Sequence, residues 1–334
     1  MANVKKLRWG LLSTARINRA LIEPIRQAER SELVAVASRS QERAKTYAAT
    51  WHIPTAYGTY EALIAAPDID AVYISLPNTL HSKWTLAAAE AGKHVLCEKP
   101  LVQTLAELDV IEETAARRGV TVFEAFMYLH HPQALRTRRM IEQGRLGRVQ
   151  LLQSWFSFYL PPEQSNNIRL RPELGGGSFW DVGVYPNSMA ITMMDGPPKE
   201  VWAQQIVGET GVDVSLIGQM RFGDGASAQI ASSFRMPFRA GTVIVGDEGT
   251  VKLDQPWKPG MESQPSLIQF VPRDGNPQNI TIEGIDPYLC EVQAMEACVL
   301  DGADPVVPLS RSRDFLRSAL ALLESARIGA PVAL

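Results

Sequence analysis

Cysteine is scarce in this chain, with three among 334 residues. Cys97, Cys290 and Cys298 form no close pair and have no metal-ligand spacing, so we expect core thiols and no disulfide framework. An excess of basic charge is also missing, since the formal net charge is -3 and the isoelectric point is near 6.0. Nucleic acid and anionic membrane surfaces are therefore not expected partners.

Long apolar runs are absent near the amino terminus. Residues 1–8 carry charge and lead into an apolar run of about five residues, too short for a signal-peptide core or a transmembrane helix. We therefore expect a cytoplasmic protein. With 46% hydrophobic and 21% charged residues, the composition is that of an ordinary globular protein, and the length suffices for two domains.

Short apolar runs alternate with Ala-rich, helix-periodic segments in the first third of the chain. The runs cover residues 7–12, 33–37, 71–76, 94–97 and 120–123. Apolar strands joined by helical crossovers are typical of a parallel sheet that is buried on both faces. We predict an α/β, doubly wound Rossmann domain over residues 1–125.

After about residue 148 the pattern changes to longer, alternating segments, which are typical of antiparallel strands. They cover residues 150–159, 218–222, 226–234 and 242–245, and helices are predicted over 178–194, 287–300 and 312–328. Gly223-Asp224-Gly225 and residues 246–249 are predicted hairpin turns, because glycine and aspartate tolerate positive φ. Residues 126–334 should form an α+β domain with a mostly antiparallel open sheet. The C-terminal helix of this domain can pack back on the Rossmann domain.

The turn after the first strand is a candidate pyrophosphate site. Ser13, Ala15 and Asn18 stand where the G-x-G-x-x-G motif has glycines. Serine and alanine are small enough for a phosphate to approach backbone N–H groups at a helix start, although serine is less comfortable at positive φ. The alternative is a plain strand-to-helix turn capped by Ser13 or Thr14.

The end of the second strand bears on the type of dinucleotide. It lacks the Asp or Glu that would bind a ribose 2′-hydroxyl, and instead carries Ser38 and Arg39, with Arg43 one turn later. These residues suit a 2′-phosphate and favour NADP(H) over NAD(H). An exposed arginine that merely starts a helix is the alternative.

Residues 94–100 form a short apolar strand that ends in Glu98, Lys99 and Pro100. Residues at strand ends in open α/β sheets face the ligand crevice. Pro100 biases Lys99 away from helical backbone angles, so the ammonium should sit at the strand end, where a fixed cation can polarise a substrate oxygen. A solvated Glu-Lys turn is the alternative.

Three segments together resemble one family, the Gfo/Idh/MocA oxidoreductases, and the resemblance spans nearly the whole chain. They are AVYISLPNTLH (71–81), AGKHVLCEKP (91–100) and GGGSFWDVGVYP (175–186). The resemblance implies an NAD(P)-binding Rossmann domain and a second domain with a mostly antiparallel sheet. It also implies a homodimer or homotetramer that assembles through this C-terminal sheet.

The resemblance places the catalytic lysine on Lys99 and the D-x-x-x-Y pair on Asp181 and Tyr185. A spacing of four on a helix puts Asp181 and Tyr185 on one face, so both can point toward one substrate while Lys99 approaches from the first domain. Tyr185 is the expected proton carrier, because a neighbouring ammonium and the nicotinamide cation favour the phenolate form. The alternative is that Lys99 carries the proton and Tyr185 orients the substrate.

The resemblance also implies a set of cofactor contacts. Those on the pyrophosphate and ribose side are Ser13, Thr14, Ala15, Arg16, Ile17, Ser38 and Arg39. Those on the nicotinamide side are Leu76, Pro77, Asn78 and His81, with Glu98 at the nicotinamide ribose. Arg169 and Tyr288 fall where relatives have substrate-side or cofactor-side residues.

Two other features are given no chemistry. His130 and His131 are adjacent, which puts them about 100° apart on a helix, and no further ligand has convincing spacing, so no metal site is predicted. The aromatic residues Trp155, Phe156, Phe158 and Tyr159 alternate along a strand, which is typical of a core or a subunit interface.

The implied reaction is hydride transfer between a nicotinamide and a secondary alcohol or ketone of a sugar-like ring. The residues resemble two branches of the family most, one that oxidises aldoses of the D-xylose type or dihydrodiols with NADP, and one that reduces nucleotide-linked 3-keto deoxysugars with NADPH. The first activity, an aldose 1-dehydrogenase, is our expectation. A dinucleotide-binding sensor without catalysis is the alternative of another class.

Overall fold

The computed structural model describes residues 6–223 and 225–334, and its first sheet has six parallel strands in the order β3-β2-β1-β4-β5-β6. The strands are β1 (Leu7–Leu12), β2 (Ser31–Ala37), β3 (Thr55–Tyr57), β4 (Ala71–Ile74), β5 (His94–Glu98) and β6 (Val122–Ala125). This order is that of a doubly wound sheet, and it confirms the predicted Rossmann architecture.

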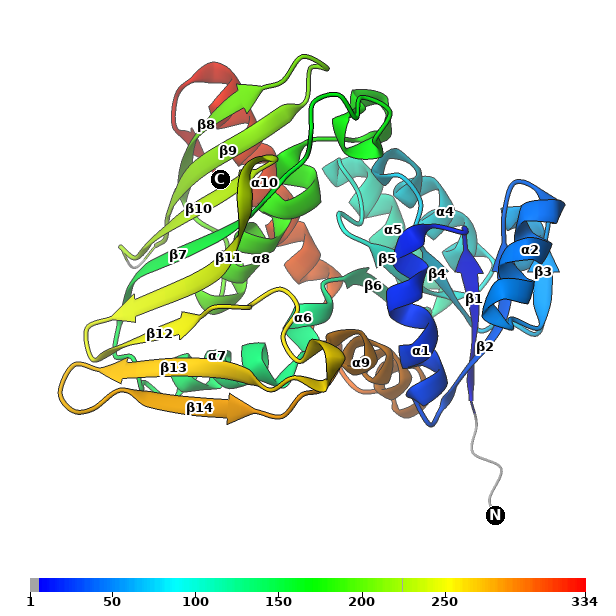
Figure 1. Ribbon diagram of the computed structural model, residues 1–334, viewed down its shortest axis with the longest axis horizontal. Coiled ribbons are helices and arrows are strands. Elements are labelled where there is room, and N and C mark those ends of the chain that lie inside the picture. The colour runs from blue at the N-terminus through cyan, green and yellow to red at the C-terminus, as the bar shows by residue number, and fades with distance from the viewer. Residues whose placement is uncertain (1–5, 224) are drawn as a thin grey trace. The chain divides into compact units, whose positions relative to one another are not determined.

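Helical crossovers connect these strands (Figure 1). They are α1 (Arg19–Gln27), α2 (Gln41–Trp51), α3 (Tyr60–Ile64), α4 (His81–Glu90) and α5 (Leu105–Arg118). The boundaries of α5 show why the sequence folds this way. The Thr104 hydroxyl accepts from the Glu107 amide, the Glu107 carboxylate accepts from the Thr104 amide, and Gly119 ends the helix at φ 64°.

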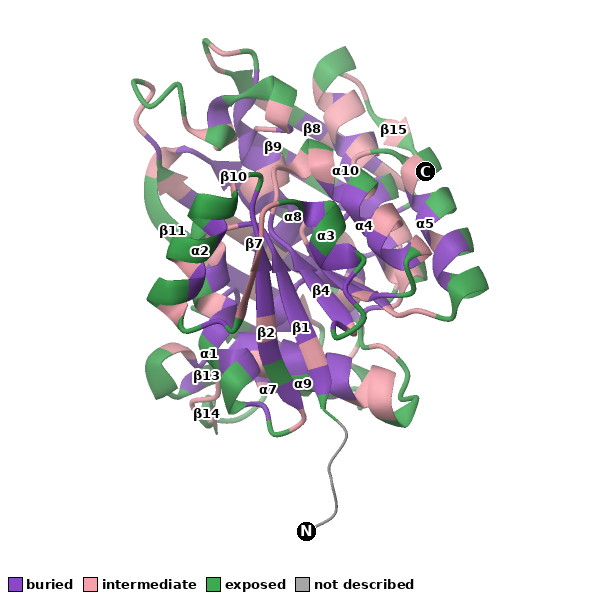
Figure 2. Ribbon diagram, turned by 90° about the vertical axis from the view of Figure 1, so that its right-hand side faces the viewer, coloured by how far each residue is buried: buried purple, intermediate pink, exposed green. Residues whose placement is uncertain are grey.

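Burial on both faces of the parallel sheet explains its apolar strands. Figure 2 shows β1, β2 and β4 mostly in the buried colour. Trp9 is fully buried in β1, and its indole N–H donates to the Ser31 hydroxyl over 3.0 Å. The one polar atom of this large side chain is thereby satisfied.

The second sheet has nine strands in the order β14-β13-β12-β11-β7-β10-β9-β8-β15. They are β7 (Val149–Tyr159), β8 (Glu200–Val207), β9 (Asp213–Arg221), β10 (Ser227–Ser233), β11 (Arg235–Gly246), β12 (Gly249–Leu253), β13 (Ser266–Pro272), β14 (Gln278–Ile282) and β15 (Val332–Ala333). The described pairings are antiparallel except that of β7 with β10, which is parallel. The sheet is therefore mostly antiparallel, as predicted, and its one described parallel pair was not foreseen because alternating polarity does not encode strand direction.

Both predicted hairpins are present. β9 pairs antiparallel with β10 around Gly223 and Gly225, while Asp224 lies outside the described residues. β11 pairs antiparallel with β12 around Asp247 and Glu248. Gly225 has φ 89°, a backbone conformation that glycine adopts without strain.

The helices that follow β6 only partly match the sequence prediction, which placed helices over 178–194, 287–300 and 312–328. They are α6 (Met127–His130), α7 (Pro132–Glu142), α8 (Val184–Met193), α9 (Pro287–Asp301) and α10 (Leu309–Ile328), and the short 3₁₀ turns include η1 (Arg16–Asn18), η2 (Asn78–Leu80), η3 (Ile168–Leu170) and η4 (Pro172–Leu174). The helix predicted over 178–194 is not α-helical throughout. It begins with a wide π-helical turn, η5 (Phe179–Gly183), before α8.

The chain divides into two compact units. The first comprises the described residues up to Met127 together with Tyr288–Leu309, and the second comprises Tyr128–Pro287 and Ser310–Leu334. The boundary expected near residue 125 remains a prediction. Among the described helices, none combines the length and the apolar character that crossing a bilayer requires.

Candidate active site

A closed polar network shapes the turn that follows β1. Ser13 has φ 144°, a backbone conformation that favours glycine. Its hydroxyl accepts from the Ala15 amide over 3.0 Å and lies 2.7 Å from the Ser75 hydroxyl, at the end of β4. The Asn18 amide group donates to the Ser13 carbonyl over 2.8 Å and accepts from the Ser75 hydroxyl over 2.6 Å. These hydrogen bonds stabilise the strained backbone conformation at Ser13, which a glycine would adopt more easily.

This turn fits the pyrophosphate of a dinucleotide. β1 lies between β2 and β4, at the point where the strand order reverses, and ligands of doubly wound sheets bind outside the strand ends at that point. η1 and α1 follow directly, and neither has a side-chain cap within the described residues. Thr14, Ala15 and Ile17 are partly exposed there and Arg16 is exposed. The backbone N–H groups of Thr14, Arg16 and Ile17 therefore suit an anion at a helix start, whereas that of Ala15 already donates to the Ser13 hydroxyl.

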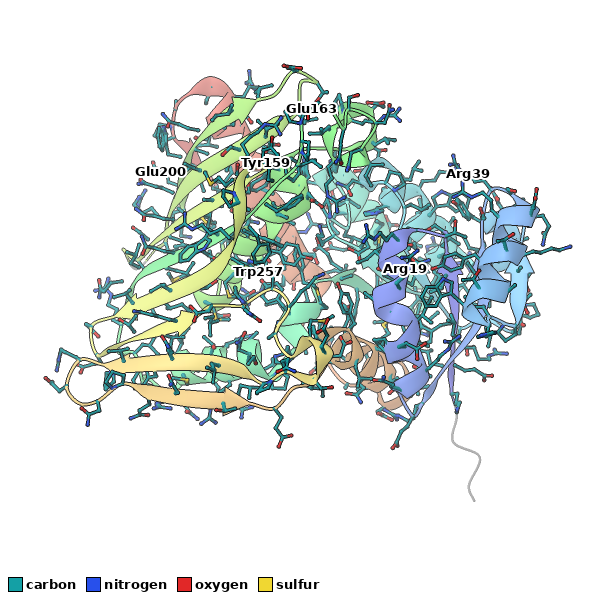
Figure 3. All side chains as sticks on the ribbon, viewed as in Figure 1. Arg19, Arg39, Tyr159, Glu163, Glu200 and Trp257 are labelled. Atoms are coloured by element: carbon teal, nitrogen blue, oxygen red, sulfur yellow. The ribbon has the colours of Figure 1, made fainter. Side chains whose placement is uncertain are left out.

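Two arginines flank the end of β2. Ser38 is buried and its amide donates to the Tyr57 carbonyl over 3.0 Å. Arg39, labelled in Figure 3, is exposed just before α2, and Arg43 is exposed in its first turn. Burial raises the pKa of Tyr60, and the Arg39 and Arg43 guanidinium groups oppose the rise, so both cations lie near its hydroxyl. This positive potential fits an additional phosphate on the adenosine ribose.

The end of β5 carries Glu98 and Lys99, both partly exposed. The Tyr73 hydroxyl, from the neighbouring strand β4, donates to Glu98 Oε1 over 2.5 Å. Burial and this carboxylate raise the pKa of Tyr73 well above its usual value, so Tyr73 remains a hydrogen-bond donor. The Lys99–Pro100 peptide bond is cis.

The loop after β4 contains other predicted contacts. Leu76, Pro77 and Asn78 are partly exposed, and η2 begins at Asn78. His81 follows at the start of α4 and differs from these residues, because it is fully buried and both of its ring nitrogens contact backbone carbonyls. Burial lowers the pKa of His81, opposed by those two backbone contacts.

Tyr288, in the first turn of α9, is 3% exposed and belongs to the same unit as β4 and β5. Its hydroxyl contributes to the raised pKa of Tyr73, which places the two tyrosines near each other. Glu291 is also buried, and burial together with Glu98 raises its pKa well above the usual range. The Glu98 carboxyl therefore lies near the Tyr73 hydroxyl and the Glu291 carboxyl.

In the second unit, Asp213 anchors the start of the helix that carries Asp181 and Tyr185. Asp213, at the start of β9, accepts from the Ser178 hydroxyl over 2.6 Å and from the Phe179 amide over 2.8 Å. Burial raises the pKa of Asp213, opposed by these hydrogen bonds. Gly177 precedes them at φ 127°, where a Cβ atom would lie 2.3 Å from Asp213 Oδ1. The glycine run thus lets a buried carboxylate reach the first amides of η5.

Asp181 and Arg169 form an ion pair. Arg169 Nε donates to Asp181 Oδ2 over 2.6 Å, and the Arg169 guanidinium lies 5.9 Å from the Phe158 ring centre. Sequence motifs indicated Arg169 and Asp181 as separate site residues, and no sequence pattern predicted that they form an ion pair. Twelve positions separate them, and η3, η4 and the tight turn at Gly176 bring the chain back.

Tyr185 lies in a cluster of aromatic rings. Its ring centre is 5.9 Å from that of Tyr128, 5.5 Å from Phe156 and 5.6 Å from Trp257, and the residue is 7% exposed. Trp257, labelled in Figure 3, comes from the segment between β12 and β13. Sequence reasoning assigned Phe156 to a core or interface and did not single out Trp257. No local motif connects a tryptophan 72 positions away to Tyr185.

The two adjacent histidines are both buried. Burial lowers the pKa of both His130 and His131 to about 4. His131 caps α7, accepting from the Gln133 amide at Nδ1 and facing the Ile285 carbonyl with Nε2. Within the described residues, no three His, Cys, Asp or Glu side chains are grouped so that they could hold a metal ion.

These features define a nicotinamide-dinucleotide oxidoreductase built from a Rossmann unit and a unit with an open, mostly antiparallel sheet. Residues 7–126 match the oxidoreductase family with an NAD-binding Rossmann fold, and residues 134–252 match the GFO/IDH/MocA C-terminal domain. The chain therefore belongs to the Gfo/Idh/MocA oxidoreductase family.

Relatives of known activity are similar over nearly the whole chain. D-xylose 1-dehydrogenase (NADP(+)) 2 of Haloferax volcanii is 38% identical over 98% of this chain and 99% of its own length. An aldose-aldose oxidoreductase from Caulobacter crescentus, solved with glycerol, has a TM-score of 0.89 and 26% identity over 99% of this chain and all of its own. A 3-ketoreductase from Actinomadura kijaniata, solved with NADP and TDP-benzene, has a TM-score of 0.86 and 28% identity over 98% of both chains.

Gly177→Ala should test the anchoring of the site helix. Gly211→Ala is the matched control, because Gly211 also has positive φ but no described atom lies within 4 Å of its added Cβ. We expect the control to lose about 1 kcal/mol of unfolding free energy and Gly177→Ala about 3 kcal/mol, since it adds a clash with Asp213. Urea denaturation measures both values, and equal losses would contradict the anchoring role of Asp213.

Proposed function

We propose that this protein is an NADP-dependent sugar dehydrogenase that oxidises the C1 hydroxyl of an aldose of the D-xylose type. The observation that carries the proposal is the surroundings of Tyr185, whose ring packs among Tyr128, Phe156 and Trp257. Aromatic faces favour the apolar C–H face of a sugar ring, and the hydroxyl supplies a polar handle. The similarity to a D-xylose dehydrogenase over nearly the full length supports the same substrate class.

The proposed dinucleotide contacts follow the strand ends of the first sheet. The backbone of residues 13–17 would hold the pyrophosphate, and Ser38, Arg39 and Arg43 the 2′-phosphate. Leu76, Pro77, Asn78 and Glu98 would meet the nicotinamide side, and Tyr288 belongs to the same proposed set. A bound nicotinamide supplies the acceptor for the hydride that leaves the sugar carbon.

Tyr185 is the proposed proton carrier and Lys99 the proposed cation that polarises the reacting oxygen. Oxidation of a hydroxyl needs removal of its proton, and a positioned side chain contributes about 10² to 10⁴-fold to such a step. Asp181 is the third proposed catalytic residue. Its carboxylate is held by Arg169, so its contribution is to orient and polarise within a fixed ion pair.

The Arg169–Asp181 ion pair favours a neutral sugar over a nucleotide-linked one. A diphosphate-bearing substrate calls for cations with unsatisfied charge, and arginine is the residue that binds phosphate best. The Arg169 guanidinium is instead engaged by a carboxylate at 2.6 Å. Reduction of a nucleotide-linked 3-keto sugar is therefore the second candidate, supported by the structural similarity to a 3-ketoreductase.

Steady turnover of D-xylose with NADP tests the proposed function. Purified protein should reduce NADP in the presence of D-xylose, seen as nicotinamide absorbance over time, and should do so more slowly with NAD. Tyr185→Phe keeps the ring and removes the hydroxyl, so it should lower kcat by about 100-fold or more. Unchanged kcat would show that Tyr185 is not the proton carrier.

Failure with every aldose would overturn the substrate class. NADPH oxidation with a nucleotide-linked 3-keto sugar would then establish the ketoreductase. Tight NADPH binding without turnover of either type of substrate would instead indicate a sensor.

Arg39→Ala tests the 2′-phosphate contact. Loss of a hydrogen bond between charged groups costs about 1.5 to 3 kcal/mol, or about 10 to 100-fold in the Kd of NADP, whereas the Kd of NAD should change less than about threefold. Arg117→Ala, an exposed arginine on α5 that pairs with Glu90, is the matched control and should change neither. Equal weakening of NADP and NAD by Arg39→Ala would remove the basis for NADP preference.

We also propose that the nine-stranded sheet forms a subunit interface. The strand registers put Ile206, Ile217 and Tyr159 on one face, and these side chains are 64%, 53% and 58% exposed. Exposed apolar groups gathered on one face mark interaction surfaces. Light scattering should give the mass of a dimer or tetramer, and Ile217→Glu should lower it. A monomer at micromolar concentration would contradict the proposal.

A further inference from the structure

His81 joins two segments that follow neighbouring strands. Nδ1 lies 2.7 Å from the Pro100 carbonyl oxygen, after β5, and Nε2 lies 2.8 Å from the Leu76 carbonyl oxygen, after β4. The residue is fully buried at the start of α4. Both short contacts therefore form in a site without bulk water.

The peptide unit that follows Lys99–Pro100 is held at both of its polar atoms. Its carbonyl, that of Pro100, meets His81, and its N–H, that of Leu101, donates to Glu124 Oε1 over 3.1 Å. Glu124 lies in β6 and is 5% exposed. Two buried side chains from different elements thus fix the backbone directly after Lys99.

The chemistry of the contacts assigns the ring a structural task. A carbonyl oxygen only accepts hydrogen bonds, so a ring nitrogen must carry a proton to bind it. A neutral ring donates to one carbonyl and an imidazolium to both. With both nitrogens turned toward backbone carbonyls and no exposed surface, the ring is in no position to contact a dinucleotide directly.

We propose that His81 is a positioning residue, which lies between the Leu76 and Pro100 carbonyls and, through a proton on Nδ1, donates to Pro100 and thereby fixes the backbone from which Lys99 projects. The proposal rests on the proposed function in one respect, the catalytic role of Lys99. Its structural part, the restraint of residues 99–101, holds independently of any substrate.

Three substitutions separate the two contacts. The side-chain amide of His81→Asn reaches the place of Nδ1 and can still donate to Pro100. That of His81→Gln reaches the place of Nε2 and can donate to Leu76. His81→Leu removes both donors. His52→Asn is the matched control, since His52 lies at the end of α2 in a left-handed conformation that asparagine tolerates.

The first readout uses the dinucleotide-free protein. Hydrogen exchange of the Leu101 amide, followed by mass spectrometry, should be about tenfold faster in His81→Gln and His81→Leu, because the Pro100 restraint is lost. It should stay within about twofold of the parent in His81→Asn and His52→Asn. Equal exchange of the Leu101 amide in the parent and in His81→Leu would overturn the proposal. Faster exchange in His81→Asn than in His81→Gln would overturn it as well. Where the leucine variant does not fold, the asparagine and glutamine variants decide.

The second readout is turnover, with Lys99→Ala measured alongside. A displaced Lys99 should lower kcat by about 100-fold in His81→Gln while KM changes less than about threefold, and His81→Asn should restore most of kcat. Full activity of Lys99→Ala would refute the proposed catalytic role of Lys99. An inactive Lys99→Ala beside a fully active His81→Gln would refute the positioning role alone. Equal loss of kcat in all three His81 variants with unchanged exchange would also refute it.

Discussion

Parallel pairing in register is the constraint on which the candidate site depends. Leu12 pairs with Ile74 and Ile74 with Cys97, so β1, β4 and β5 end at one edge of the sheet. Because of this register, Ser13, Ser75 and Glu98 lie at the same edge of the sheet. The Ser13–Ser75–Asn18 network and the two carbonyls that face His81 depend on this alignment.

At this edge, hydrogen bonds between buried polar groups stabilise backbone conformations that elsewhere require glycine or contact with solvent. Ser13 takes a backbone conformation that favours glycine, and hydrogen bonds to Ser75, Ala15 and Asn18 accompany it. In the second unit, Asp213 similarly holds the start of η5. Buried polar groups are stable only when they are satisfied, so each network fixes one local backbone geometry. Tyr185, the proposed proton carrier, follows the Asp213 network along the chain.

Much of the fold could be predicted from the sequence because apolar strands, helix caps and turn residues are local signals. The strand over 7–12 and the hairpin around Asp247 are examples, and the five predicted runs correspond to β1, β2, β4, β5 and β6, whereas the three-residue β3 was not predicted. The parallel pairing of β7 with β10 could not be predicted, because apolar and polar residues alternate in the same way in parallel and antiparallel strands. The π-helical turn at Phe179–Gly183 was also not predicted. Its start contacts Asp213, which is more than 30 positions away in the sequence, so no local pattern indicates it.

The candidate site was predicted in its residues more than in its contacts. Motif positions such as Lys99 and Tyr185 can be found in a sequence, whereas the meeting of Arg169 with Asp181 and the packing of Trp257 on Tyr185 arise from loops of the tertiary fold. The proposed reaction is hydride transfer from a sugar carbon to nicotinamide. The most direct test uses D-xylose deuterated at C1 together with NADP and measures the mass of the reduced dinucleotide. We expect one deuterium in the reduced nicotinamide, and an unlabelled product or no reduction would contradict hydride transfer from C1.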